Sequence, residues 1–367
     1  MTIKNHFKIP NKLKCILHIG TEKTGTSSIQ HYLSNNRDVN EEQGVLYLKL
    51  SGTGSQVEFI AAVADIGDLG DMSDIFSINE KSSQKNFKFN LQKYIYQQLF
   101  VNSRDSNIST LIISSEHFHS RLTRLDAIQR LKDFLDPFIE QYSVVMYVRR
   151  QVEMATSYYS TRLKSGQFDI PILPNLNKQH ESLNYYFNFN AIYDNWSSIF
   201  GADSMLVSIY HRDNLYKKNV VTDFCQLINI KYYDVPKSIN VNTSINAIGL
   251  AHINFINYYL FYMKKYFPTF TKLLLLEIVT KIGAIYHSKT NLVTQEDAAN
   301  FMDAFTLSNN ALLTKIKPQN KTLFDSDFST YPTALPVINL NKFKALSLLS
   351  SVILNHIKRK YKTTPRL

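Results

Sequence analysis

A short apolar run that enters a hydroxyl-rich, glycine-containing stretch constrains the fold of this chain more than any other feature. The run is CILHIG at residues 15–20, and TEKTGTSS follows at residues 21–28. A buried strand that leads through such a turn into a helix lets the free amides of the helix N-terminus face an anion. The sequence therefore predicts a strand over 15–20, a phosphate-binding loop, and a helix over 26–33.

The lysine of this loop is displaced relative to a nucleoside-triphosphate P-loop. That motif reads G-x-x-x-x-G-K-[ST], in which the lysine reaches the β- and γ-phosphates and the hydroxyl binds Mg²⁺. Gly20 and Gly25 have the right spacing, but Thr26 stands in the lysine position and Lys23 lies inside the loop. Three consecutive hydroxyl side chains and the free amides at the helix start can hold a phosphate without a metal. We therefore expect no metal site.

Further apolar runs alternate with helical patterns along the chain. The expected strands cover residues 110–115, 143–149 and 204–210, and the expected helices cover 122–141, 152–164 and 220–228. This alternation predicts an α/β fold with a central parallel sheet flanked by helices, whose ligands bind at the carboxyl ends of the strands.

The rest of the chain supports a single domain. Residues 51–109 and 165–185 are polar and are expected to be loops that act as lids or bind an acceptor, whereas residues 245–317 are expected to be mostly helical. We expect an α/β core over about 13–235 and a mostly helical C-terminal portion over about 245–367.

Two segments of the chain resemble sulfotransferases that use 3′-phosphoadenosine 5′-phosphosulfate (PAPS). TEKTGTSS resembles their 5′-phosphosulfate loop, and SVVMYVRRQVEMATSYY supplies Arg149 at a strand end and Ser157 eight residues later. In that family this pair holds the 3′-phosphate, and the arginine fork suits a phosphate. The family often follows the arginine with Asp-Pro, whereas this chain has Arg150-Gln151, as in a bacterial branch that acts on carbohydrates and capsular polysaccharides. Resemblance to that branch extends over residues 187–201, 220–224, 242–244 and 323–332.

The resemblance implies a P-loop NTPase-like sulfotransferase fold and a transferase activity. The enzyme would move a sulfuryl group from PAPS, which leaves as PAP, to an acceptor hydroxyl on a sugar of a surface glycan or its precursor. The residues implied in PAPS binding are Thr21, Lys23, Thr24, Gly25, Thr26, Ser27, Ser28, Arg149 and Ser157.

Catalysis needs a cation for the leaving phosphate and a base for the acceptor proton. Lys23 is the candidate cation. In the stretch SSEHFHSRL, Glu116 is the first candidate for the base, with His119 and His117 as alternatives. Each histidine could instead be a hydrogen-bonded residue without a catalytic role, and Glu116 could form an ion pair with a nearby arginine.

Four other residues have competing interpretations. His18 and Trp196 are expected to be core residues, although Trp196 could stack on adenine. Tyr210, after the fourth strand, could lie near the acceptor. Arg150 could guard the phosphate site or pair with Glu153.

The composition favours an anionic partner. Lys and Arg outnumber Asp and Glu by 41 to 30, a net charge of +11, without a nucleic-acid-binding motif. The N-terminus lacks the apolar run of a signal peptide, so we expect a cytoplasmic protein. Residues 346–362 predict a last helix with an apolar face at 346, 349, 353 and 357 and a basic end. It either packs on the domain or attaches loosely to the anionic inner face of a membrane.

Two other functions compete with sulfuryl transfer. A P-loop kinase or NTPase would need a lysine after Gly25 and a metal-binding aspartate, and the sequence shows no clear candidate for either. A non-catalytic nucleotide- or glycan-binding relative would not need Lys23, Arg149 and Ser157 together.

Overall fold

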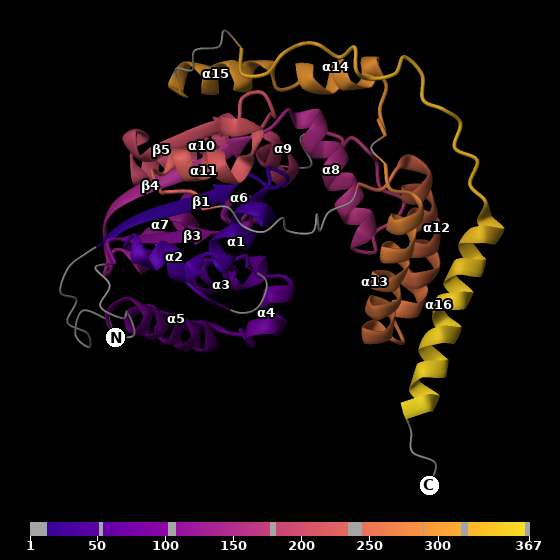
Figure 1. Cartoon of the computed structure of the whole chain (residues 1–367), viewed down its shortest axis with the longest axis horizontal. Helices are drawn as coiled ribbons and strands as arrows, with labels where there is room; N and C mark the ends of the chain where they lie inside the picture. The colour runs from indigo at the N-terminus through magenta and orange to yellow at the C-terminus, as the bar shows by residue number, and fades with distance from the viewer. Residues whose placement is uncertain are drawn as a thin grey trace. The chain divides into compact units, whose positions relative to one another are not determined.

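The computed structural model describes residues 13–50, 54–101, 108–176, 181–233, 244–288, 290–316 and 322–363. The chain divides into two compact units (Figure 1). The first comprises Met1–Arg149, Leu176–Lys237 and Phe305–Phe324, and the second comprises Arg150–Asn175, Ser238–Ala304 and Asp325–Leu367. The described residues do not include 1–12 and 242–243, so the predictions for the N-terminus and for most of 242–244 lie outside them.

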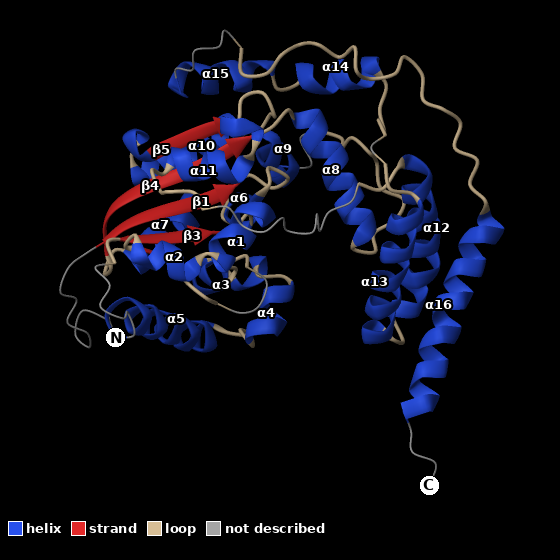
Figure 2. Cartoon of the chain, in the orientation of Figure 1, coloured by secondary structure: helices blue, strands red, loops and turns tan. Residues whose placement is uncertain are grey.

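A parallel five-stranded sheet forms the centre of the first unit (Figure 2). Its order is β2-β3-β1-β4-β5, and the strands are β1 (Leu13–Gly20), β2 (Val45–Tyr47), β3 (Thr110–Ser114), β4 (Ile139–Val148) and β5 (Met205–Ile209). The four predicted strands and the α/β class are confirmed. The prediction missed β2, because a three-residue strand is too short to show a hydrophobic period.

Helices surround this sheet. Those of the first unit are α1 (Thr26–Asn35), α2 (Arg37–Glu42), α3 (Glu58–Val63), α4 (Asp71–Phe76), α5 (Lys81–Tyr96), α6 (His117–Arg121), α7 (Leu125–Leu135), α9 (Glu181–Phe187), α10 (Phe189–Phe200), α11 (Val220–Leu227) and α15 (Thr306–Ile316). Helices α1 and α11 pack their apolar side chains on Ile16 and Tyr147 of the sheet. Helix α10 packs Phe200 on Tyr142, with ring centroids 4.9 Å apart.

Two expectations about the first unit were wrong. The segment 122–141 is not one helix, because α7 ends at Leu135 and β4 begins at Ile139. Pro137 lies between them, and proline disfavours the helical conformation of the residue before it. The segment 51–109 is not mainly loop, since its described residues include helices α3, α4 and α5.

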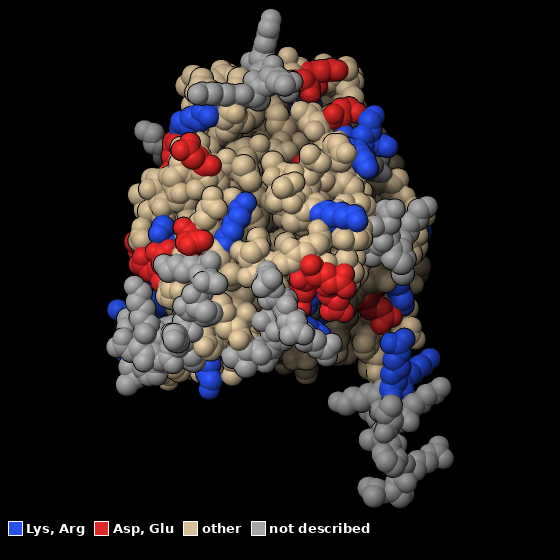
Figure 3. All heavy atoms as spheres, turned by 60° about the vertical axis from the view of Figure 1, so that its left-hand side comes forward, with Lys and Arg blue, Asp and Glu red and all other residues tan. Residues whose placement is uncertain are grey.

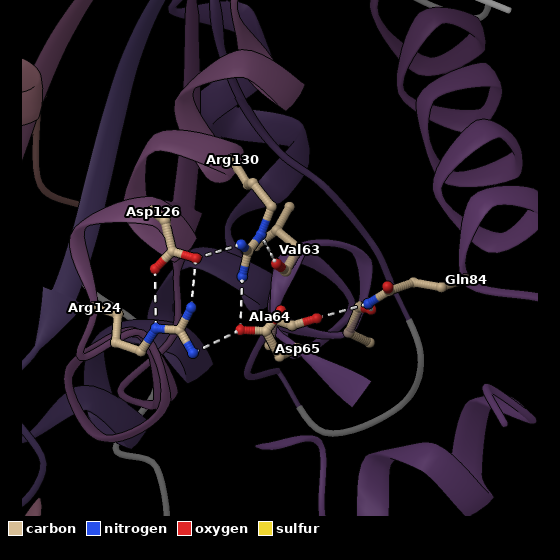
Figure 4. A network of polar contacts seen from close by, with 8 residues as sticks. Val63, Ala64, Asp65, Gln84, Arg124, Asp126 and Arg130 are labelled. Atoms are coloured by element: carbon tan, nitrogen blue, oxygen red, sulfur yellow. Dashed lines mark hydrogen bonds and ion pairs between the residues drawn. The ribbon is translucent and has the colours of Figure 1, made fainter. Parts of the chain in front are cut away.

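A network of polar contacts holds two of these helices, α3 and α5 (Figure 4). Arg130 of α7 donates its Nε to the carbonyl of Val63 at 2.7 Å and forms an ion pair with Asp65 at 3.2 Å. Gln84 of α5 donates to the carbonyls of Ala61 and Ala64, which end α3. The partners are 20 to 67 residues apart in the sequence, so no local pattern could show them.

The second unit is a helical assembly. Its helices are α8 (Gln151–Lys164), α12 (Ala247–Lys264), α13 (Pro268–Ile285), α14 (Gln295–Asp303) and α16 (Lys342–Thr363). Leu250, Ile253 and Ile278 are among the residues of its core. The expected helical character of residues 245–317 is confirmed for the described residues. None of the helices in the described part of the chain is both long and apolar enough to cross a bilayer.

Helix α16 packs on α12 and α13 with a face that matches the predicted one in part, since Leu349 is buried and Ile353 packs against the core as predicted. The buried residues are Ala345, Leu349 and Val352, whereas Leu346 and Ile357 of the predicted face are exposed. Apolar residues occur on more than one side of this helix, so its period identified the packed side only in part.

Arg150 contacts residues 325–328 of the second unit. These residues belong to the stretch 323–332, to which the sequence assigned a resemblance but no role. The Arg150 guanidinium donates two hydrogen bonds of 3.1 Å to the carbonyl of Asp327 and lies 3.4 Å from a carboxylate oxygen of Asp325. It also stacks over the Phe328 ring, 4.6 Å from the centroid. The side chain is nearly buried, so these contacts compensate for the lost hydration of a cation.

His18 and Trp196 are both fully buried, as predicted. The Nδ1 of His18 lies 2.8 Å from the Ser114 hydroxyl, and its ring contacts Tyr147 and Phe224. Burial lowers the pKa of His18 to about 3. His18 is therefore a neutral core residue.

This burial predicts a loss of stability in acid. An unfolded histidine takes up a proton below its usual pKa of 6.5, whereas folded His18 resists protonation down to about pH 3. The free energy of unfolding should fall as pH decreases through this window, by up to about 1.4 kcal/mol per pH unit for this one group. The free energy of unfolding can be measured by urea denaturation between about pH 7 and about pH 5. It should fall less steeply with decreasing pH in His18→Gln than in the wild type, because the variant takes up about one proton fewer on unfolding. Equal slopes would contradict this assignment.

Candidate phosphate-binding site

The loop between β1 and α1 has the backbone that an anion site requires. The predicted order of strand, loop and helix is confirmed. Gly25, which precedes α1, has φ 82° and gives the helix no side-chain cap. The hydroxyl residues Ser27 and Ser28 are exposed in the first turn. The first amides of α1 therefore have no capping side chain to compete with an anion.

Two threonines of the loop have structural roles. Both side chains are buried. Thr24 donates its hydroxyl to the carbonyl of Thr21 at 2.6 Å, and Thr21 donates to the carbonyl of Tyr147 at 3.0 Å. These bonds tie the loop to itself and to β4. Direct hydroxyl contacts from Thr21 and Thr24 to a cofactor remain a prediction.

Lys23 lies at the crown of the loop in the left-handed backbone region, with φ 66°. Burial lowers the pKa of Lys23, and the cation of Arg149 lowers it further, while Glu22 and Glu116 oppose the shift. The ammonium is thus partly desolvated between two carboxylates and a second cation. A bound dianion would favour its charged form.

Arg149, at the end of β4, holds this crown. Its guanidinium donates to the carbonyl of Lys23 at 2.9 Å and lies over the Tyr210 ring, 5.5 Å from the centroid. The two residues are 126 positions apart in the sequence. The structure brings both predicted cations of the first unit to one place, at the carboxyl ends of adjacent strands.

A carboxylate that the sequence analysis did not consider adjoins the lysine. Glu22 accepts a hydrogen bond of 2.9 Å from the Tyr186 hydroxyl. Burial alone would raise the pKa of Glu22, but His119, Tyr186 and Lys23 together hold it below its usual value. The sequence signal that could have pointed to Glu22 is its position next to Lys23 in the loop.

His119 supports this network. Its Nε2 lies 2.9 Å from the Tyr186 carbonyl, and its Nδ1 lies 3.4 Å from the amide nitrogen of Glu22. The ring is fully buried, and burial lowers its pKa although Glu22 opposes the shift. A buried imidazole with both nitrogens in contact is better suited to positioning the loop than to accepting a proton from a substrate.

Glu116 lies where β3 meets α6, beside the glycine that ends β1. Its Cα would be 3.4 Å from a Cβ built on Gly20. Its carboxylate accepts hydrogen bonds from Gln30 at 2.7 Å and Ser55 at 3.2 Å, and its charge raises the pKa of Lys23. Glu116 is therefore the candidate base that lies within electrostatic reach of Lys23.

The remaining two candidates are placed differently. His117 follows Glu116 and is partly buried, and its Nδ1 has no hydrogen-bond partner among the described residues. Ser157 lies on α8, in the second unit. The roles of both stay predictions.

No group of three or more His, Cys, Asp or Glu side chains that could hold a metal ion occurs in the described ranges. On the face shown in Figure 3, Lys and Arg side chains are interspersed with Asp and Glu side chains over a mostly uncharged surface. The basic surplus of the chain thus forms no single large patch on that face.

Gly25 should not tolerate any side chain. A Cβ at this position would lie 2.9 Å from Cγ1 of Val220 and 3.0 Å from Cε2 of Tyr210, and φ is positive. We expect Gly25→Ala to lower the free energy of unfolding by about 2 kcal/mol or more, from backbone strain and overpacking. Thermal denaturation measures this. Gly67→Ala is the control, because a Cβ there would meet nothing within 4 Å; similar losses in both variants would contradict the prediction.

Comparison with known proteins gives three kinds of result. No family model matches the chain. An uncharacterised protein of Archaeoglobus fulgidus is 28% identical over 145 residues, which is 39% of this chain and 36% of that protein. The chain thus matches little more than a third of the length of this relative.

Three of the solved structures similar to this chain are sulfotransferases or sulfotransferase domains. The sulfotransferase from Alicyclobacillus acidocaldarius has a TM-score of 0.40 and 16% identity, over 77% of this chain and 98% of that one. The sulfotransferase domain of the curacin biosynthetic pathway has a TM-score of 0.32 and 13% identity, over 62% of this chain and 76% of that one. The sulfotransferase domain of the Synechococcus PCC 7002 olefin synthase has a TM-score of 0.32 and 16% identity, over 82% of this chain and 96% of that one.

Proposed function

We propose that the protein is a PAPS-dependent sulfotransferase. The observation that carries the proposal is the contact of Arg149 with the carbonyl of Lys23. This hydrogen bond joins a phosphate-type loop to an arginine at the end of β4, the strand beside β1 in the sheet. The lysine of the loop lies at its crown and not in the first helical turn. PAPS carries a 5′-phosphosulfate and a 3′-phosphate on one nucleoside, and so needs two cations that lie near each other.

The residues present fit this co-substrate. The uncapped amides of α1, with Ser27 and Ser28, suit the 5′-phosphate, and Lys23 lies in the same loop. Arg149 is assigned to the 3′-phosphate together with Ser157, as the sequence resemblance implies. Of the nine residues expected to bind PAPS, the remaining four (Thr21, Thr24, Gly25 and Thr26) contribute loop shape and backbone amides.

Two side chains would carry the chemistry. When bound, PAPS supplies a sulfuryl group on a good leaving group. Lys23 would neutralise the charge that grows on the phosphate oxygen as its bond to sulfur breaks. Glu116 would take the proton from the acceptor hydroxyl as that oxygen bonds to sulfur. His119 would keep Glu22, and with it the crown, in place.

We assign the acceptor to a sugar hydroxyl of a surface glycan or its precursor. This assignment follows from the sequence resemblance to the bacterial carbohydrate branch, and the acceptor screen described below tests it.

Calorimetric titration with PAP, beside ATP with Mg²⁺, tests the cofactor. We expect a micromolar dissociation constant for PAP, about −8 kcal/mol, and much weaker binding of ATP with Mg²⁺. PAP binding would justify a screen of glycan acceptors with ³⁵S-labelled PAPS. Tight ATP–Mg²⁺ binding without PAP binding would favour a kinase or NTPase. PAP binding without transfer to any acceptor would favour a non-catalytic relative.

A further inference from the structure

The last turn of α12 and the turn that joins it to α13 expose several large aromatic side chains. Phe261 and Tyr262 are each 57% exposed, Tyr266 is 70% exposed, and Phe267 is 59% exposed. Aromatic rings of this size are normally buried, and an exposed group of them on one element marks an interaction site. We call residues 258–267 the turn surface.

Several rings of the turn surface form a cluster with Phe168. Tyr258 lies 5.3 Å from Tyr262 between ring centroids, and Phe168 lies 5.7 Å from Tyr258 and 5.3 Å from Phe261. All of these residues belong to the second unit. Contact among Phe168, Tyr258, Phe261 and Tyr262 makes these rings one apolar group. The exposed Tyr266 and Phe267 follow them in the chain.

The charges within residues 258–267 are all positive, although the exposed Asp169 follows Phe168 of the same cluster. Lys264 and Lys265 are exposed within the turn surface, and Lys265 lies over the Tyr266 ring at 5.7 Å. Lys272 follows in the next helix, and residues 258–276 contain no Asp or Glu. Aromatic rings interleaved with lysines suit a partner that is apolar inside and anionic at its surface.

The basic end of α16 lies at the same end of the helical assembly. His356 of α16 lies 5.9 Å from the Phe270 ring and 3.0 Å from Glu277, both in α13. The next turn carries Lys358 and Arg359, which are exposed. Figure 1 shows the α12–α13 turn and the end of α16 on one side of these three helices.

We propose that the turn surface docks on a lipid bilayer that is rich in anionic lipid. The Phe and Tyr rings insert at the level of the headgroups, and Lys264 and Lys265, with the end of α16, contact lipid phosphates. Contact is peripheral, since no helix among the described residues could span the bilayer. A second copy is a poorer occupant, because a symmetric dimer through this surface would face lysines with lysines.

Cosedimentation of the full-length protein with vesicles tests this proposal. The vesicles contain phosphatidylcholine alone or phosphatidylcholine with phosphatidylglycerol. We expect binding to the anionic vesicles that is about tenfold tighter than to the neutral ones and that weakens with salt. Tyr266→Ser with Phe267→Ser should weaken binding to anionic vesicles about tenfold, and Lys264→Glu with Lys265→Glu should abolish the preference for anionic lipid.

A matched pair at the other end of α16 is the control. Lys342 and Phe343 are also an exposed lysine and aromatic, with Phe343 84% exposed. Lys342→Glu with Phe343→Ser should bind anionic vesicles as the wild type does. Absence of wild-type binding, or equal binding by the wild type and both turn-surface variants, would overturn the proposal. A dimer in light scattering that the Tyr266→Ser, Phe267→Ser variant loses, without vesicle binding, would instead assign the surface to a second copy.

Discussion

Lys23→Ala is expected to lower the turnover of PAPS by about 10²- to 10³-fold, which is typical of losing one group that stabilises a developing anion. The ammonium lies at the loop crown, partly desolvated, with Glu22, Glu116 and Arg149 close enough to shift its pKa. A cation in this position acts mainly as the leaving phosphate gains charge. PAP affinity should therefore fall much less than turnover, and initial rates with ³⁵S-labelled PAPS beside PAP calorimetry measure the two effects separately.

Lys217→Ala is a matched control for this variant. Lys217 is an exposed lysine of the first unit with φ 52°, so it repeats both the charge and the left-handed backbone of Lys23. It should leave turnover unchanged. Wild-type turnover in Lys23→Ala would remove Lys23 from the mechanism, whereas equal losses in both variants would indicate a non-specific effect of net charge.

Arg149→Ala is expected to weaken PAP binding about 100-fold. Hydrogen bonds to charged groups contribute about 1.5–3 kcal/mol each, and the guanidinium would lose its contacts to the 3′-phosphate. It also holds the Lys23 carbonyl at 2.9 Å, so the loop itself should become less well ordered. Calorimetry with PAP measures the change, and Arg149→Lys should recover only part of it, because lysine lacks the fork.

Arg124→Ala controls for the loss of an arginine. Arg124 pairs with Asp65 and Asp126, in the network of Figure 4. Its loss should leave PAP affinity unchanged. A double-mutant cycle with Lys23→Ala adds a sharper test: because the charge of Arg149 acts on the Lys23 ammonium, the two changes should be non-additive. An unchanged PAP affinity in Arg149→Ala would break the proposed two-part site.

Much of the fold could be predicted because it follows local patterns. Buried parallel strands are short apolar runs, so four of the five strands were found, and the glycine-bounded loop was placed correctly. Helices α3 and α4 were missed because each has only six residues, and α5 because its sequence is polar. The positions of α3 and α5 also depend on contacts between residues far apart in the sequence, made by Arg130 and Gln84. The packed side of α16 was predicted only in part, because apolar residues occur on more than one side.

The same division applies to the candidate site. The sequence by itself determined that Lys23 stands in a hydroxyl-rich loop after a strand, and that Arg149 ends another strand. The tertiary structure decided that Arg149 holds the Lys23 carbonyl across 126 residues, that His119 is buried against Tyr186, and that Glu116 faces Gln30. Strand and helix periods are set by neighbouring residues, whereas these contacts arise when the sheet brings remote strand ends together.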